Sequence, residues 1–121
     1  MSIVLRAFPI RAKDQLQGFV DSLNGERKDE ADSFYRSYDV SHESWHIQDT
    51  PAGPWVICLT IIANPTEAAA RYATSNGDFE SWFKSQAMQV TGINLNAEPL
   101  GPPTERIFAW SNPDDPNSAL L

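Results

Sequence analysis

The alternation of apolar and polar positions divides the chain into strands and helices. Ile3 to Phe8 is a short apolar run that ends at Pro9, as expected of a strand, because proline lacks the amide hydrogen that a sheet needs. Apolar side chains then recur at intervals of three and four, the spacing of one helical face: Ala12, Leu16, Phe19, Val20 and Leu23. After a charged stretch, an apolar face resumes at Phe34, Tyr35 and Tyr38. This pattern predicts either a second short helix or a continuation of the first helix beyond a kink.

The middle of the chain predicts a β-hairpin. Side chains alternate from Ser41 to Gln48, so the two faces of a strand can be assigned. One face carries His42, Ser44, His46 and Gln48, and the other carries Glu43, Trp45 and Ile47. Residues 55–63 are apolar on both faces and rich in β-branched side chains, which is typical of a central strand, and a turn at residues 50–54 joins the two.

Two further helices are predicted after the hairpin. Asn64, Pro65 and Glu67 form a helix start, with a cap, a proline in the first turn and a capping-box partner. Asp78 is predicted to cap another helix, which Gly92 ends. The inward face of that helix is rich in aromatic residues: Phe79, Trp82, Phe83, Gln86, Ala87 and Val90.

The rest of the chain is predicted to complete one domain. Residues 106–110 form a last strand, and residues 111–121 have the prolines and aspartates of a mobile tail. A chain of 121 residues is large enough for one core and too small for two, so residues 1–110 are assigned to a single domain. A loop precedes the last strand around Pro99, Pro102 and Pro103.

The order strand, helices, strand, strand, helices, strand predicts an α+β fold of the ferredoxin-like, split β-α-β type. In such a fold a four-stranded antiparallel sheet carries its helices on one face only. The other face would still hold apolar side chains, and an open apolar face is a liability in a monomer. We therefore expect a homodimer in which two such sheets pack together as a dimeric α+β barrel. Those side chains are drawn from Val4, Phe8, Val56, Ile62, Phe108 and Trp110.

Charge and composition narrow the choice of partners. The net charge of −7 and the pI near 4.6 argue against nucleic acid and anionic membranes, which reward clustered Lys and Arg. The sequence has no apolar run of membrane-spanning length and no signal-peptide layout, so a cytoplasmic location is expected. Cys58 is the single cysteine, which excludes an intrachain disulfide, and its apolar neighbours predict a small buried hydrophobe.

Three stretches carry a resemblance to a known family: Glu26-Arg27-Lys28-Asp29-Glu30, Glu43-Ser44-Trp45, and Phe79-Glu80-Ser81-Trp82-Phe83-Lys84 running to Thr91-Gly92-Ile93-Asn94-Leu95. Through them the chain, from Ile3 to about Trp110, resembles an uncharacterised family of small dimeric α+β-barrel proteins, a domain of unknown function. More distantly it is similar in fold to the antibiotic-biosynthesis monooxygenases, which act on aromatic polyketides, often without a cofactor. The resemblance implies a homodimer with an apolar or aromatic ligand.

His42 and His46 are the only histidines. On a helix their spacing would suggest a metal pair, but on one face of a strand they lie about 13 Å apart, too far to share an ion. They are interpreted as polar groups on an exposed face, or else His46 alone accepts a proton in a barrel cavity. Glycine-rich phosphate loops, nucleophile elbows and cysteine–histidine clusters are absent from the sequence, so neither a metal nor a cofactor is expected.

Glu43 and Arg6 are the other polar candidates. A carboxylate among apolar neighbours has a raised pKa, which suits a general base, but Glu43 could equally pair with a basic residue. Arg6 stands in an otherwise apolar strand, where it could anchor an anion or carbonyl, or form a structural salt bridge. Trp82 and Trp110 could wall a pocket for a flat ligand, or serve the core or an interface.

Two classes of function fit these features. The first is a small-molecule-binding homodimer whose cavity takes an apolar or aromatic compound, with cofactor-independent oxygenase or isomerase chemistry. Its candidate ligand-binding residues are Arg6, Glu43, His46, Trp82 and Trp110. The second is a non-enzymatic dimeric module for protein interaction or regulation. An open cavity with a few convergent polar groups would favour the first class, and a solidly packed interior would favour the second.

Overall fold

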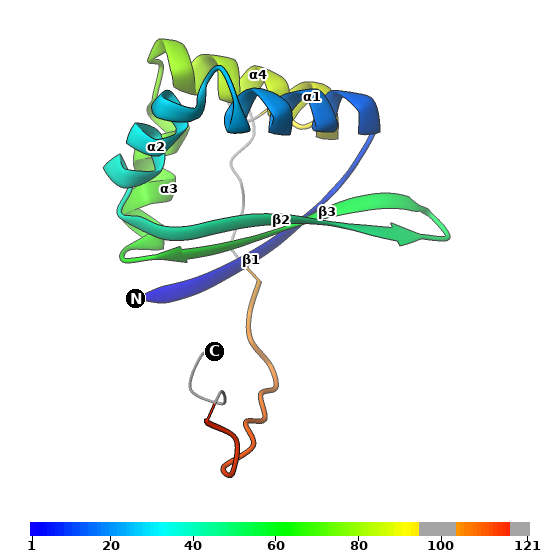
Figure 1. Cartoon of the computed structure of the whole chain (residues 1–121), viewed down its shortest axis with the longest axis vertical. Helices are drawn as coiled ribbons and strands as arrows, with labels where there is room; N and C mark the ends of the chain where they lie inside the picture. Colours follow the sequence, from blue (N-terminus) through cyan, green and yellow to red (C-terminus); the bar gives the residue numbers. More distant parts are fainter. Residues whose placement is uncertain (95–103, 117–121) are drawn as a thin grey trace.

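A computed structural model describes residues 1–94 and 104–116. The fold is α+β, with four helices packed on one side of a three-stranded antiparallel sheet (Figure 1). The elements in chain order are β1 (Ser2–Pro9), α1 (Lys13–Asn24), α2 (Lys28–Ser37), β2 (Val40–Thr50), β3 (Gly53–Ile62), α3 (Pro65–Thr74) and α4 (Asp78–Thr91). The α+β class and the single helical layer predicted from the sequence are therefore confirmed.

The strands are arranged in the order β1-β3-β2, and β3 is antiparallel to both neighbours. The predicted hairpin is confirmed: β2 and β3 pair from Val40–Ile62 to Thr50–Gly53, and Gly53 turns the chain with a φ of 112° that favours glycine. A β-bulge interrupts the pairing between Val40 and His42. The central position of β3 explains why this strand is apolar on both faces.

The sheet has three strands within the described residues, where four were predicted. Residues 106–110, predicted as the last strand, are exposed and form neither strand nor helix. Only Thr104 reaches the free edge of β1, where its amide and hydroxyl both donate to the Leu5 carbonyl, at 3.2 and 2.7 Å. A run of apolar residues forms a strand only if its backbone also finds an edge to pair with. The proline loop predicted around Pro99, Pro102 and Pro103 lies outside the described residues.

The helix boundaries follow local sequence signals. The sequence left open whether the first helical region is one kinked helix or two helices. The structure has two, because α1 ends at Asn24 and α2 begins at Lys28. The Asn64 side chain accepts a hydrogen bond from the Glu67 amide at 3.1 Å, as the predicted capping signal requires. The helix α4 ends at Gly92, whose φ of 81° is left-handed.

The prediction that Asp78 caps α4 was wrong. Asp78 is the first residue of α4 and Gly77 is its N-cap, without a side-chain hydrogen bond at that position. The Asp78 carboxylate therefore lies in the first turn, where it still complements the positive end of the helix dipole.

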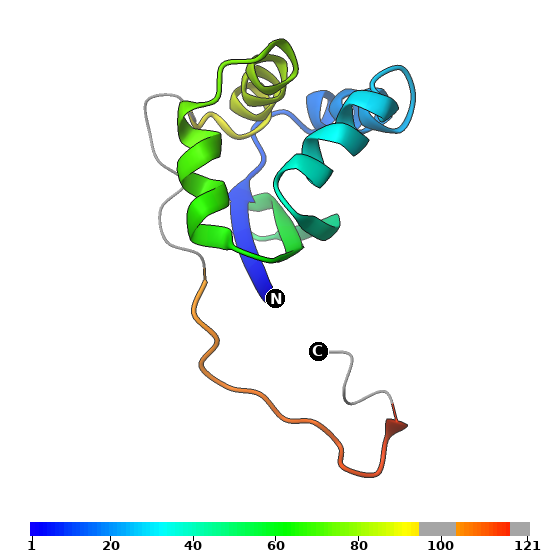
Figure 2. The same cartoon turned by 90° about the vertical axis from the view of Figure 1, so that its left-hand side faces the viewer.

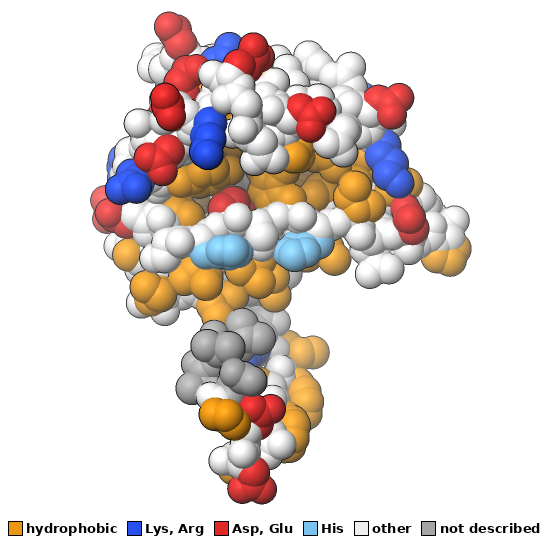
Figure 3. Space-filling view, in the orientation of Figure 1, with side chains coloured by type: hydrophobic (Ala, Val, Ile, Leu, Met, Phe, Trp, Pro, Cys, Tyr) orange, Lys and Arg blue, Asp and Glu red, His pale blue; other side chains and the backbone are white. Residues whose placement is uncertain are grey.

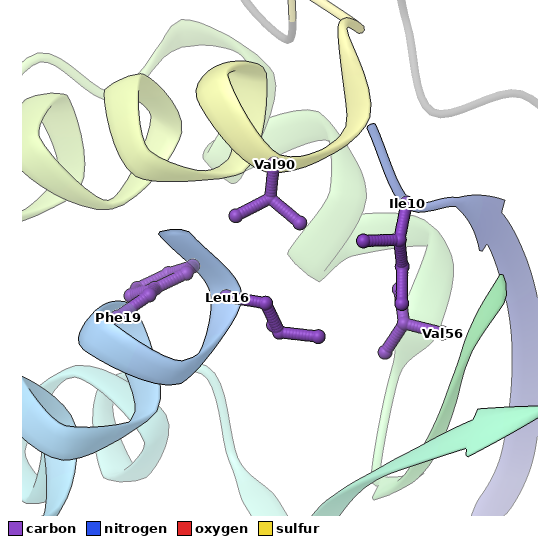
Figure 4. Close-up of a cluster of buried hydrophobic side chains, with 5 residues drawn as sticks. All are labelled: Ile10, Leu16, Phe19, Val56 and Val90. Carbon is purple, nitrogen blue, oxygen red and sulfur yellow. The ribbon is translucent and has the colours of Figure 1, made fainter. Parts of the chain in front are cut away.

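Two buried clusters join the helices to the sheet. The first brings together side chains from both layers: Ile10, Leu16, Phe19, Val56 and Val90 (Figure 4). The second is aromatic and centres on Phe34, whose ring stacks on Phe83 with centroids 5.1 Å apart. Phe79 of α4 completes it, 5.2 Å from the Phe34 ring. These contacts hold α4 against α1 and α2.

Among the described residues, no helix or strand covers the sheet face turned away from the helices (Figures 1 and 2). Cross-strand partners share a face, so the β1–β3 pairs Ile3–Ile61, Leu5–Leu59 and Ala7–Ile57 all lie on this side. Ile3 and Leu5 keep 42% and 41% of their surface exposed, a large fraction for apolar residues of a sheet. We call this surface the outer sheet face.

Candidate functional site

A cavity of about 230 Å³ lies between the helices and the opposite, inner face of the sheet. Most of its wall is apolar or aromatic, and the helix side is supplied by α2, α3 and α4, with Leu16 of α1. The sheet side is supplied by every second residue of the three strands, as the two-residue period of a strand requires. These sheet residues are Val4, Arg6, Phe8, Glu43, Trp45, Val56, Cys58, Thr60 and Ile62, and Val40, on the other side of the β-bulge, joins them.

The register of the sheet sets the polar groups in two rows across the cavity. Glu43 of β2 pairs with Thr60 of β3, and Trp45 pairs with Cys58. Arg6 of β1 pairs with Cys58 from the other side. Because β3 separates β1 from β2, Arg6 and Glu43 stand on opposite sides of the central strand.

Glu43 is the carboxyl group of the cavity wall. The Thr60 hydroxyl lies 3.1 and 2.9 Å from its two oxygens, and the Trp45 indole donates to Oε1 at 3.2 Å. Burial raises the pKa of Glu43 from 4.5 to about 7, although the hydrogen bonds from Thr60 and Trp45 favour the ionised form and limit the shift. Among the described residues Glu43 forms no ion pair. The carboxyl can therefore bind or release a proton near neutral pH.

Arg6 and Cys58 complete the polar part of the sheet side. Burial lowers the pKa of the Arg6 guanidinium, and Cys58 opposes that shift. Burial raises the pKa of the Cys58 thiol to about 12, with a further contribution from Glu43. Cys58 is therefore a neutral thiol at physiological pH and not a nucleophile. Its predicted role as a small hydrophobe agrees with this position, though it faces the cavity and is only partly buried.

Two tyrosines supply hydroxyl groups from the helix side. Tyr35 of α2 and Tyr72 of α3 both line the cavity, and burial raises the pKa of each phenol above its ordinary value. Within the described part of the chain, the Tyr72 hydroxyl is buried without a hydrogen-bond partner. A buried donor of this kind is costly to leave unsatisfied, so it offers a bond to a molecule in the cavity.

The sequence missed these two tyrosines and Thr60. Thr60 had a readable signal, because it is the polar residue of an apolar central strand and the hairpin register sets it opposite Glu43. Tyr35 and Tyr72 carried no such signal. Aromatic residues at helical spacing fit a core equally well, and only the packing of the helices shows which rings line the cavity.

The histidines lie on the other side of the sheet. His42 and His46 pair with Ile61 and Ile57 on the outer sheet face, and the His46 ring lies 3.0 Å from the Ser44 hydroxyl. The predicted alternation of β2 thus separates His46 from Glu43. Both histidines follow the bulge, so the regular spacing that keeps them from sharing an ion is preserved.

Trp82 and Trp110 do not line the cavity. Trp82 of α4 packs in the helical layer, with its ring 5.4 Å from Phe19 and 5.6 Å from Phe79, and the Arg27 guanidinium lies 4.3 Å above it. Trp110 follows Thr104 in the extended segment and is 72% exposed. Of the five residues predicted for a site, the structure brings Arg6 and Glu43 to one cavity.

A groove of about 590 Å³ runs beside the cavity, between β2 and the helices α1 and α2. Figure 3 shows the corresponding hollow between the helical layer and the sheet, with apolar side chains inside it. Tyr35, Val40, Glu43 and Trp45 border both the groove and the cavity. The groove is therefore a route by which solvent or a ligand can reach the Glu43 carboxyl.

In the described ranges, 1–94 and 104–116, no group of three or more His, Cys, Asp or Glu residues could hold a metal ion. In the same ranges, no helix is both long and apolar enough to cross a membrane. Comparison of the chain with protein-family models, curated proteins and solved structures finds no match.

Proposed function

We propose that the protein binds a small apolar or aromatic molecule in the cavity and that Glu43 is its polar partner there. The observation that carries this proposal is a carboxyl group in an aromatic-walled cavity, with a pKa of about 7. A buried carboxyl with a purely structural role is expected to form an ion pair with a basic side chain. Glu43 instead accepts hydrogen bonds from the Thr60 hydroxyl and the Trp45 indole. Strongly shifted groups in clefts are common at functional sites.

Proton transfer is the chemistry that this arrangement supports. As a carboxylate, Glu43 can accept a proton from a carbon or hydroxyl of the ligand, and as an acid it can return that proton to another atom. Arg6, on the other side of β3, would stabilise the negative charge that develops on a ligand oxygen. Isomerisation needs these two steps alone.

The binding of 2-naphthol, a flat apolar probe with one hydroxyl, tests the proposed site. Methyl NMR spectra should change at cavity residues such as Val4, Val56 and Ile62, and not at Ile107, which is 91% exposed. Glu43→Gln should weaken binding, whereas Glu30→Gln, on the exposed side of α2, should leave it unchanged. Changes confined to the outer sheet face would contradict the proposal.

The second candidate function is self-association. We propose that two chains form a homodimer through their outer sheet faces, as a ferredoxin-like dimeric α+β barrel. The support is the apolar face that one chain leaves uncovered, since exposed patches of this kind usually mark interfaces. A purely structural or regulatory dimer would need no cavity, so the dimer and the ligand site can be tested separately.

A further inference from the structure

The segment of residues 104–116, here called the arm, holds three of the four most exposed large apolar side chains among the described residues. Every residue of the arm is exposed, and the exposed fractions of Ile107, Phe108 and Trp110 are 91%, 81% and 72%. Large apolar side chains this exposed lose all the free energy that burial would give them, about 1.5–3 kcal/mol each. Within the described residues, these three side chains have no surface that covers them.

The direction of the arm indicates where that surface lies. Its start is fixed at the free edge of β1 by the two hydrogen bonds from Thr104 to Leu5. From there the arm leaves the sheet and runs away from the helices, on the side of the outer sheet face (Figures 1 and 2). A second chain that covered the outer sheet face would occupy the space beside the arm.

The edge of β1 is too short to take up the whole arm. If the pairing continued antiparallel from Thr104 opposite Leu5, Ile107 would stand opposite Ser2, the first residue of β1. Trp110 would then lie past the end of this strand. A fourth strand within the same sheet would therefore leave Trp110 unpaired.

The outer sheet face is suited to a second copy of the same chain. None of its strand positions carries Asp, Glu, Lys or Arg, although the chain has a net charge of −7. Two copies can therefore approach through this face without bringing like charges together. Figure 3 shows apolar side chains gathered on this side of the sheet around the two histidines.

We propose, on the basis of the homodimer proposed above, that the arm docks on the second copy and buries Phe108 and Trp110 against it, reciprocally in both directions. A two-fold axis makes both arms equivalent, so one contact is formed twice. Two aromatic rings from each arm would add about 600–1,000 Å² to the interface, a large share of the roughly 1,600 Å² of a standard one. The exposed arm and the uncovered sheet face then have a single explanation.

Sedimentation equilibrium of four chains tests this inference: the unaltered chain, Phe108→Asp with Trp110→Asp, Ile3→Asp, and a chain that ends at Ser111. The arm variant should weaken the dimer by about tenfold or more, as expected for central aromatic residues. Ile3→Asp, which puts a charge on the outer sheet face, should weaken it as well. The chain ending at Ser111 keeps the aromatic part of the arm and should dimerise like the unaltered chain.

The outcomes separate the arm from the homodimer. If the unaltered chain is a monomer, the homodimer is wrong and the arm has no partner. If Ile3→Asp weakens the dimer and the arm variant does not, the homodimer stands and the arm inference is wrong. In the monomeric Ile3→Asp background, the arm variant should leave the free energy of unfolding unchanged. A loss of stability there would show that the arm packs on its own chain, which overturns the inference.

Discussion

At the residue scale, the behaviour of Glu43 follows from its neighbours. The strand period places it on the inner face with Trp45, and the hairpin register adds Thr60. These two donors satisfy the carboxyl, while its partial burial among apolar side chains raises its pKa to about 7. The sequence alone predicted the face and the direction of the shift. It left an ion pair with a basic residue open, because side-chain partners depend on tertiary packing.

The first prediction concerns stability against pH. The folded chain holds the Glu43 proton up to about pH 7, and the unfolded chain releases it near 4.5, so the protonated carboxyl stabilises the fold below pH 4.5. That contribution is lost as the pH rises to about 7. Glu43→Gln mimics the protonated form, so it should be more stable than the unaltered chain at pH 8, by on the order of 2–3 kcal/mol.

Urea denaturation at pH 4.5 and at pH 8 checks this prediction. The two chains should be nearly equal at the lower pH and differ at the higher one. Glu30→Gln, at an exposed ion pair of α2, is the matched control and should change little at either pH. A Glu43→Gln effect that is the same at both pH values would show a solvated carboxyl.

The second prediction concerns the Tyr72 hydroxyl. Because this buried group has no partner among the described residues, Tyr72→Phe removes an unsatisfied donor and keeps the ring. Thermal unfolding should show no loss of stability, or a gain of up to about 1 kcal/mol. The same change should weaken 2-naphthol binding if the hydroxyl bonds the ligand. A clear loss of stability without ligand would mean that the hydroxyl is already satisfied, for example by water.

At the element scale, helices and hairpin could be predicted because their signals are local. The Asn64 cap, the left-handed Gly92 and the alternation of β2 each depend on a few neighbouring residues. The segment 106–110 is a short, mostly apolar run of the kind that often forms a strand, yet it forms no strand in the described chain. A strand requires a free backbone edge at the right place. Whether the arm can pair with the edge of β1 depends on the tertiary structure, which the local sequence of the arm does not contain.

The third prediction concerns the role of α4. Trp82 packs between Phe19, Phe79 and Arg27, so it joins α4 to α1 and to the loop before α2. Trp82→Ala should lower the free energy of unfolding by about 3 kcal/mol or more, as for other large aromatic truncations. Met88→Ala, at an exposed position of the same helix, should cost far less. Equal effects in urea denaturation would show that the Trp82 ring does not hold the helix.

At the scale of the whole molecule, the two faces of the sheet differ in their surroundings and in their side chains. The inner face and the helices enclose a cavity with a titratable carboxyl, and the outer face is apolar over β1 and β3 and carries no Asp, Glu, Lys or Arg. The sequence predicted an apolar second face and drew its side chains from a set that includes Val4, Phe8, Val56 and Ile62, which is wrong for these four. In the structure these four side chains line the cavity, and the outer face is formed by their strand neighbours. When a central strand is apolar on both faces, its composition cannot show which of its residues face the helices.

The most direct test of the account is a carbon-13 NMR titration of the Glu43 side-chain carboxyl, assigned by its absence in Glu43→Gln. The cavity described here predicts a titration midpoint near pH 7, well above the ordinary 4.5 of a glutamate. Saturation with 2-naphthol should move that midpoint, because the ligand would contact the carboxyl directly. A midpoint near 4.5 that does not respond to the ligand would show that Glu43 is in water, and it would contradict the proposed site.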